Sequence, residues 1–330
     1  MSAFEIASKL SSTVWLLAAI AWLAPPSAAR AETAWEGKTV RQWADQLTDP
    51  DVRVRWYATY ALGQLGPKAA DAIGPLHKML QKKSEQEYVR GNAAWAIGRL
   101  GNAAEVEIPL LMDTMHSRGH ISVRRNSVEA MGNLGPSAAR AVPELVKMLD
   151  DDDAVTRVNT AVALWKIARH PRAVPYLLET LRHGVRPAPY EAAVALGRLD
   201  GPAETVAPAL VDALHDADPD VRRAAARSLG QIGRLAFPAL KDKKALDDPD
   251  AGVRAMVVEA IEWMGPTAVK PLIKALEDES PAVRRSAARA LGRLGSDARP
   301  AEAALVAAVN DPREEVRDEA AKALRRIRGE

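Results

Sequence analysis

The chain has 330 residues, with 45 Lys and Arg against 43 Asp and Glu, which gives a formal net charge of +2. A charge so close to zero does not suit a chain that binds polyanions over its whole surface, so we expect no nucleic-acid partner. Cysteine is absent, which excludes disulfide bonds, thiolate metal sites and a cysteine nucleophile.

The first 31 residues have the layout of an export signal. Lys9 precedes an apolar run of eleven residues at 14–24, two prolines end the run, and Ala29 and Ala31 are the small residues that a signal peptidase recognises. A membrane-spanning helix needs about 20 apolar residues, so a retained anchor is the weaker interpretation. We expect cleavage after Ala31 and export to the periplasm or cell surface of a bacterium, with residues 32–330 as the mature chain and no transmembrane anchor.

From residue 40 onward one sequence pattern recurs about nine times, and it is clearest at residues 218–233, DPDVRRAAARSLGQIG. Its Val position returns every 30 to 35 residues, which indicates a repeat array rather than a closed globular domain. The nine positions are Val54, Val89, Val123, Thr156, Ala188, Val221, Val253, Val283 and Val316.

Each repeat predicts two antiparallel helices, which we name helix A and helix B in chain order. In helix B, apolar or small residues fall at positions 0, 4, 7, 8 and 11 counted from the Val position, and this spacing forms one stripe of a helix. Helix B starts at an Asp-Pro pair or a similar turn and in six repeats ends at a glycine, which suits a left-handed C-cap. Helix A has a proline near its start in seven repeats. In the seventh repeat Lys241 and Lys244 replace apolar residues, and we expect residues 238–247 to fray first.

The pattern V-R-x-x-A-x-x-A-L-G-x-L-G after an Asp/Pro turn resembles the PBS-lyase-type HEAT-like repeat over residues 40–327. The resemblance implies an all-α fold, an α-solenoid of about nine two-helix repeats whose B helices line the concave face. That family includes chromophore-lyase subunits, iron-dependent deoxyhypusine hydroxylases, DNA-alkylation glycosylases and plain interaction scaffolds, so the resemblance leaves the function open. The fifth repeat departs from the pattern with Pro189, and Trp165, Glu262 and Arg325 replace the glycine at position 9, where we expect less close packing.

An arginine follows the Val position in eight repeats. A row of guanidinium groups could form a track for phosphates, but a ligand site is expected to vary between repeats, whereas a structural contact recurs. We therefore predict that each arginine binds the turn and the Asp of its own or the next repeat. We call this set the arginine ladder, and its members are Arg55, Arg90, Arg124, Arg157, Arg222, Arg254, Arg284 and Arg317.

Positions 2, 3, 6 and 10 of helix B point away from the buried stripe and differ between repeats. In the first two repeats they are aromatic, and the four residues should form one patch because residues four apart share a helix face and neighbouring helices lie about 10 Å apart. The patch could anchor a protein partner, or it could pack beneath the segment around Trp35 as a cap over the first repeat. Its members are Trp56, Tyr57, Tyr60 and Trp95.

Toward the C-terminus the same outward positions become basic. This basic row is either a solvated face or a site for an acidic ligand, whose binding would depend strongly on salt. Its members are Arg223, Arg227, Arg285, Arg289 and Arg293, and Arg198, Lys322 and Arg326 extend it.

A search for catalytic motifs is negative. None of the six histidines is followed by Glu, so the His-Glu pairs that the resemblance implies for an iron hydroxylase are missing. The acidic run at residues 150–153 lacks the spacing of a calcium loop and is expected to cap a helix. No phosphate loop, nucleophile elbow or zinc spacing occurs. We therefore expect no catalytic residue, no metal and no cofactor.

Together these observations predict a non-catalytic scaffold, not an enzyme, whose concave face binds a partner macromolecule, in the first place a protein. One alternative is a HEAT-like enzyme, either an iron hydroxylase or a nucleic-acid-modifying relative. A second alternative is a chaperone-like subunit of the bilin-lyase type.

Overall fold

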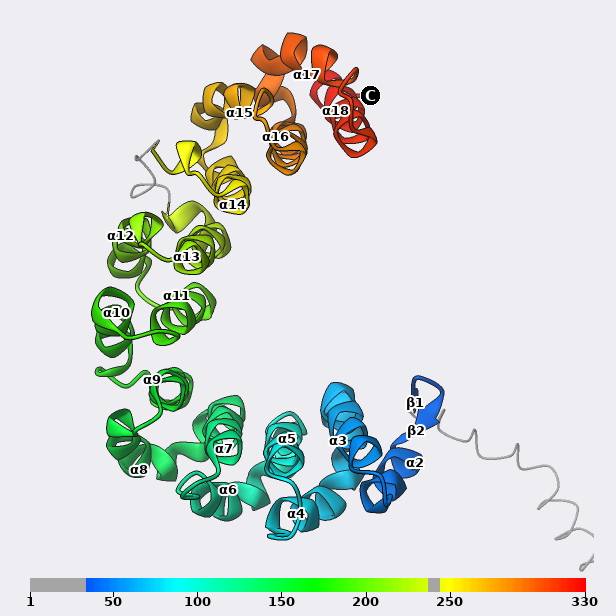
Figure 1. The fold of residues 1–330 in the computed structure, drawn as a ribbon, viewed down its shortest axis with the longest axis vertical. Coiled ribbons are helices and arrows are strands. Elements are labelled where there is room, and N and C mark those ends of the chain that lie inside the picture. The colour runs from blue at the N-terminus through cyan, green and yellow to red at the C-terminus, as the bar shows by residue number, and fades with distance from the viewer. Residues whose placement is uncertain (1–33, 237–243) are drawn as a thin grey trace, which may run out of the picture. The chain divides into compact units, whose positions relative to one another are not determined.

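The computed structural model describes residues 34–236 and 244–330, which fall into two compact units. The first unit ends at Ala104, and the second runs from Glu105 to Glu330. Both consist of antiparallel helix pairs, as the repeat pattern predicts, and Figure 1 shows these pairs within each unit. The predicted export signal lies outside the described residues, as does most of the seventh helix A, which was expected to fray.

Within each unit the B helices form one row and the A helices a second row (Figure 1). The B helices are α3 (Val52–Leu65) and α5 (Glu87–Ile97) in the first unit, and α7 (Ile121–Leu134), α9 (Ala154–Ala168), α11 (Ala188–Arg198), α13 (Pro219–Ile232), α14 (Ala251–Ile261), α16 (Pro281–Leu294) and α18 (Glu314–Arg328) in the second. The A helices are α2 (Val40–Asp45) and α4 (Ile73–Gln81), then α6 (Ile108–Thr114), α8 (Val142–Lys147), α10 (Ala173–His183), α12 (Ala203–Asp212), α15 (Val269–Ala275) and α17 (Glu302–Ala308). None of the described helices is both long and apolar enough to cross a bilayer.

A short β-hairpin that the sequence did not predict precedes α2. It pairs β1 (Ala34–Trp35) with β2 (Lys38–Thr39), and its two-residue turn has positive φ at Glu36 and Gly37. Thr39 then starts α2, because its Oγ1 accepts a hydrogen bond from the Gln42 N–H at 3.2 Å while Gln42 Oε1 accepts one from the Thr39 N–H at 2.8 Å. The hairpin therefore has a fixed connection to the first helix.

Positions 0, 4, 7 and 8 of the stripe predicted for helix B are buried in repeats such as that of α16, whereas position 11, which is Leu294 there, is half-buried. In α16, Val283, Ala287, Ala290 and Leu291 are each at most 1% exposed. The large side chain at position 8 fills the space between repeats, and the small side chains at positions 4 and 7 allow neighbouring helices to approach. The prediction of an all-α solenoid is confirmed by this burial and by the helix pairs.

The glycine at position 9 lies where one B helix contacts the next. A Cβ placed on Gly292 would lie 3.0 Å from the Cα of Ala323, and one on Gly132 would lie 3.1 Å from the Cα of Ala163. Both alanines hold position 7 of the following repeat. Position 9 therefore faces position 7 across the contact, and the two backbones are close because neither residue carries a large side chain.

Replacing Gly197 by Ala is expected to destabilise the second unit by about 1 to 3 kcal/mol, because the backbone would have to move. The new Cβ would lie 2.6 Å from the Cα of Ser228. Gly230→Ala is the matched control, since its Cβ would lie at an ordinary 3.7 Å from the Cα of Ala260. There the gain in helix propensity, about 1 kcal/mol, should leave stability unchanged or higher. Thermal unfolding followed by circular dichroism makes the comparison, and equal stabilities would contradict the close approach at Gly197.

The glycines that end the B helices have the predicted positive φ, but the predicted left-handed helical cap is wrong. Gly66, Gly135 and Gly295 have φ of 58°, 58° and 56° with ψ of −135°, −139° and −132°. This is the mirror image of the extended region, which glycine can adopt because it has no Cβ. The chain thus leaves helix B in an extended direction and enters a 3₁₀ turn that leads to the next A helix.

The position of one proline also differs from the prediction. Helix α12 begins at Ala203, so Pro208 lies inside the helix rather than near its start. The acidic run behaves as expected for a cap, since Asp153 precedes α9 and its carboxylate accepts a hydrogen bond from the Thr156 N–H at 2.8 Å.

Candidate partner-binding face

The arginine ladder connects consecutive repeats through their turns. Arg284 donates from Nη1 to the carbonyl oxygens of Asp278 and Glu279, in the turn before its own helix, at 2.8 and 3.0 Å. Its Nε and Nη2 donate to the Asp311 carboxylate of the next repeat at 2.7 and 3.0 Å. The Arg284 side chain is 14% exposed. The guanidinium group therefore holds two turns together within the protein.

Other members of the ladder make the same kind of contact with local variations. The pairs with an acid of the next repeat are Arg55 with Glu85, Arg124 with Asp151, Arg222 with Asp248, and Arg254 with Asp278. Arg157 donates to the hydroxyl of Tyr176 instead, Arg90 to the carbonyl oxygen of Leu80, and Arg317 to the two carbonyl oxygens of its own turn. These contacts engage every guanidinium group of the ladder, although the buried Arg124 Nε has no hydrogen bond and lies 3.3 Å from the Asp151 carboxylate. The ladder therefore does not present a row of open cation sites.

The carboxylates between repeats should make the fold sensitive to acid. The hydrogen bond from Arg284 lowers the pKa of Asp311, and the hydrogen bond from Arg125 lowers the pKa of Asp153. A carboxyl group with a lowered folded pKa stabilises the fold above its unfolded pKa of about 3.9, and this stabilisation is lost as the pH falls through the folded value.

We therefore expect the free energy of unfolding to be nearly constant from about pH 5 to neutrality and to fall below about pH 4. Urea unfolding at pH 7 and pH 3 measures the difference. The Arg284→Ala variant should show a smaller loss, because the folded-state pKa of its Asp311 is no longer lowered by this partner. Equal unfolding free energies at the two pH values in the unmodified chain would contradict the role given to these ion pairs.

The four aromatic residues of the predicted patch lie together, and Tyr57 and Tyr60 contact the hairpin. Trp56 stacks on Tyr60 and Tyr60 on Trp95, each with ring centroids 5.8 Å apart and planes within 7° of parallel. Trp35 of β1 lies 5.8 Å from Tyr57 and 6.0 Å from Tyr60. The hairpin thus packs against one part of the patch.

The members of the patch differ in how far the fold uses them. The Tyr57 hydroxyl donates to Glu36 of the hairpin at 2.7 Å. The Trp95 ring lies so close over Gly63 that a Cβ there would be 2.2 Å from it. Trp56 is 39% exposed. The hairpin and Gly63 thus fix Tyr57 and Trp95, whereas Trp56 stacks on Tyr60 and stays exposed.

The basic row is partly neutralised by acids on neighbouring helices. The pairs are Arg223 with Asp220 and Asp250, Arg289 with Glu259, and Arg293 with Glu262. In the part of the chain that the structure describes, Arg227 and Arg285 have no acid partner, and both are exposed. The row is therefore not the continuous cationic stripe that its basic members suggest, because two acids of the intervening repeat pair with it, Glu259 from outward position 6 and Glu262 from position 9.

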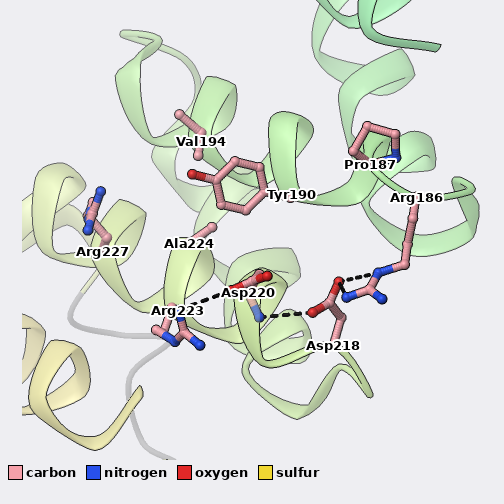
Figure 2. Close-up of a pocket in the computed structure, with 9 residues that line it drawn as sticks. All are labelled: Arg186, Pro187, Tyr190, Val194, Asp218, Asp220, Arg223, Ala224 and Arg227. Carbon is pink, nitrogen blue, oxygen red and sulfur yellow. Dashed lines mark hydrogen bonds and ion pairs between the residues drawn. The ribbon is translucent and has the colours of Figure 1, made fainter. Parts of the chain in front are cut away.

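A cavity of about 480 Å³ lies on the B-helix face between α11 and α13. Figure 2 shows Tyr190 and Val194 from α11 and Ala224 from α13 in its middle, with Arg186 and Arg227 at opposite ends. Arg186 pairs with Asp218. Tyr190 was not among the partner-binding residues predicted from the sequence. It is 38% exposed and holds position 2 of its repeat, as Trp56 does. The signal in the sequence is an aromatic residue at an outward position of the fifth repeat.

Candidate ligands for a metal ion do not cluster in the part of the chain that the structure describes. Among residues 34–236 and 244–330, no group of three or more His, Cys, Asp or Glu side chains could hold a metal ion. One of the histidines, His116, lies 3.8 Å from the single carboxylate of Glu144. The His, Asp and Glu side chains of the described residues therefore do not fit an iron centre.

Paired helices, a recurring buried stripe and ladder contacts from one repeat to the next define an α-solenoid. The chain belongs to the HEAT-repeat family, whose model, described as HEAT repeats, matches residues 40–119, 108–188, 186–242 and 243–325.

Similar proteins include an enzyme and two protein complexes. A deoxyhypusine hydroxylase of Phaeosphaeria nodorum is 28% identical over 256 residues, 66% of this chain and 77% of that protein. The complex of CpcE and CpcF of phycocyanin lyase from Nostoc sp. PCC7120 is 24% identical with a TM-score of 0.47, covering 79% of this chain and 97% of that chain. Kap95p bound to RanGDP is 12% identical with a TM-score of 0.56, covering 88% of this chain and 46% of that chain.

The fungal relative overturns one prediction. The search for catalytic motifs predicted that the chain is not an enzyme, and similarity to a deoxyhypusine hydroxylase contradicts that prediction. The missing His-Glu pairs were an insufficient basis for it. Enzymes and scaffolds can share the same stacking residues, and catalytic side chains can come from positions that are distant in sequence.

Proposed function

We propose that this HEAT-repeat protein is a scaffold whose B-helix face binds a protein partner. The observation that supports the proposal most strongly is the placement of exposed aromatic residues. Four aromatic residues are exposed among the described residues, and three of them, Trp56, Tyr190 and Trp263, hold outward positions 2, 2 and 10 of their repeats at 39%, 38% and 46% exposure. The fourth, Tyr88, lies one residue before the Val position. Aromatic side chains that remain exposed at a protein surface are the usual anchors of protein interfaces.

The division of labour within the repeat supports the same proposal. Constant positions such as the buried Leu291 and the half-buried Arg284 are used in contacts between repeats, so they are unable to distinguish one partner from another. Outward positions differ between repeats and leave side chains such as Trp56 and Arg227 accessible. The resemblance noted from the sequence would place this face on the concave side, and repeat proteins commonly bind partners there.

Partner capture from the native source tests the proposal. The triple variant Trp56→Ser, Tyr190→Ser, Trp263→Ser is expected to recover far less of the captured partner than the unmodified chain. The matched control is Val106→Ser, Val185→Ser, Val306→Ser, which changes three apolar residues that are 73%, 81% and 46% exposed and lie off the B helices. Equal recovery by both triple variants would contradict binding through the B-helix face.

A second candidate function is a catalytic activity of the kind that the fungal relative's name gives. The 28% identity to that deoxyhypusine hydroxylase favours it. The purified chain can be incubated with a deoxyhypusine-bearing protein and ferrous iron, and the product examined by mass spectrometry. A gain of one oxygen atom would support this candidate, and an unchanged mass would count against it.

We also propose that the chain is exported to the periplasm or cell surface and that residues 1–31 are removed. The apolar run at residues 14–24 and the small residues before Glu32 support this proposal. N-terminal sequencing of the protein isolated from its native envelope is expected to begin at Glu32. An intact N-terminus beginning at Met1 would contradict processing.

A further inference from the structure

A groove in the second unit consists of two neighbouring cavities on the B-helix face. Their volumes are about 480 and 240 Å³. The first lies between α11 and α13, and the second lies between α13 and α14 and extends to Arg293 of α16. Arg227 of α13 lines both. The two cavities therefore flank a single guanidinium group.

Each cavity offers apolar surface beside that group. Tyr190, Val194 and Ala224 line the first, as Figure 2 shows, and Met256 and Trp263 line the second. The rings of Tyr190 and Trp263 are 38% and 46% exposed. A ligand that reaches into both cavities would cover these rings, and burying them removes apolar surface from water.

Four arginines and four acids line the groove, and of these arginines Arg227 alone has no acid partner among the described residues. The four acids each have an arginine partner, and the pairs are Asp218 with Arg186, Asp220 with Arg223, Glu259 with Arg289, and Glu262 with Arg293. Arg227 is therefore the lining arginine without an acid partner among the described residues, at the point where the two apolar cavities meet.

We propose that this groove binds a short extended segment of the partner protein in which one Asp or Glu lies between apolar side chains. This inference rests on the proposed function and identifies the kind of partner. The carboxylate would accept two parallel hydrogen bonds from the Arg227 guanidinium, and the apolar side chains on either side would enter the two cavities.

The same charges argue against a nucleic acid in this groove. A nucleic-acid strand brings one phosphate per nucleotide and gains affinity from many unpaired cations. Here it would meet four carboxylates and one unpaired guanidinium. A peptide with a single carboxylate matches this arrangement, because it supplies one acid for the one guanidinium that lacks a partner among the described residues.

A phage-displayed library of random dodecapeptides, selected against the full chain, is the probe. The selected peptides are expected to carry one Asp or Glu with aromatic or aliphatic neighbours. The most enriched peptide, made synthetically, should bind the Arg227→Gln variant at least about tenfold more weakly, as expected for losing a hydrogen bond to a charged group. Tyr190→Ser should weaken binding as well.

Arg285→Gln is the matched control, because Arg285 belongs to the same row, is exposed and lacks an acid partner, but does not line either cavity. It should bind the peptide like the unmodified chain. Circular dichroism of each variant verifies that the fold is retained.

Several results would overturn the inference. The first two are a selection that enriches no peptide and enriched peptides without an acidic residue. The others are equal binding of the peptide to the Arg227→Gln variant and to the unmodified chain, and stronger competition by a single-stranded oligonucleotide than by the acidic peptide. Peptides whose binding requires Trp56 and not Arg227 would contradict the assignment of the groove as the binding site but would leave the proposed function intact. Peptides that crosslink to the A helices would contradict both.

Discussion

Replacing Leu291 by Ala is expected to lower the free energy of unfolding of the second unit by ~2 to 5 kcal/mol. Leu291 is fully buried at position 8 of α16, which contacts α14 and α18. Truncation removes buried methylene groups and leaves a cavity in a contact between repeats, and both effects destabilise the fold. Urea unfolding followed by circular dichroism measures the change.

The matched control is Leu235→Ala, because Leu235 is 68% exposed and its truncation should change stability by no more than about 0.5 kcal/mol. Each repeat of a solenoid contacts only its neighbours. Amide hydrogen exchange in the Leu291→Ala variant should therefore accelerate most in α14, α16 and α18. Similar losses for the two leucine variants would contradict the stacking role of position 8.

Replacing Arg284 by Ala should destabilise the second unit by roughly 3 kcal/mol, whereas replacing its neighbour Arg285 should have little effect. Arg284 makes four hydrogen bonds to two turns, and Asp311, its carboxylate partner, is 8% exposed at its side chain. Truncation leaves that carboxylate without its partner. Arg285 is exposed and has no acid partner among the described residues. Equilibrium unfolding of both variants in urea gives the comparison.

A double-mutant cycle separates the ion pair from the rest of the Arg284 side chain. Adding Asp311→Asn to Arg284→Ala removes the unpaired charge, so the two substitutions should cost less together than the sum of their separate effects. Strict additivity would show that Arg284 stabilises the fold without coupling to Asp311, and would contradict the contact between repeats.

The fold was predictable from the sequence because its main features recur. One glycine, one leucine and one arginine repeat at fixed positions, and nine copies make each pattern clear. Two features of the fold were missed. The hairpin from Ala34 to Thr39 has no counterpart in other repeats, and the mirror-image conformation of glycines such as Gly66 depends on where the following chain must go.

The candidate site was less predictable, because it depends on neighbours in space. The basic row was identified from its arginines, but Glu259 and Glu262 lie about one repeat away in sequence and neutralise two of them. Arg227 becomes distinctive only when the partners of the other residues are known. The prediction of no enzyme failed for a related reason, since sequence adjacency is a poor test for side chains that can converge from different repeats.

Photo-crosslinking tests most directly the claim that the outward positions of helix B bind the partner. Benzoylphenylalanine can be placed at residue 190 on α11 in one protein and at residue 306 on α17 in another, because Tyr190 and Val306 are 38% and 46% exposed. Irradiation in the native source is expected to attach the partner at residue 190 and not at residue 306. Attachment at residue 306 alone would contradict the account, because it would place the partner on the A-helix row.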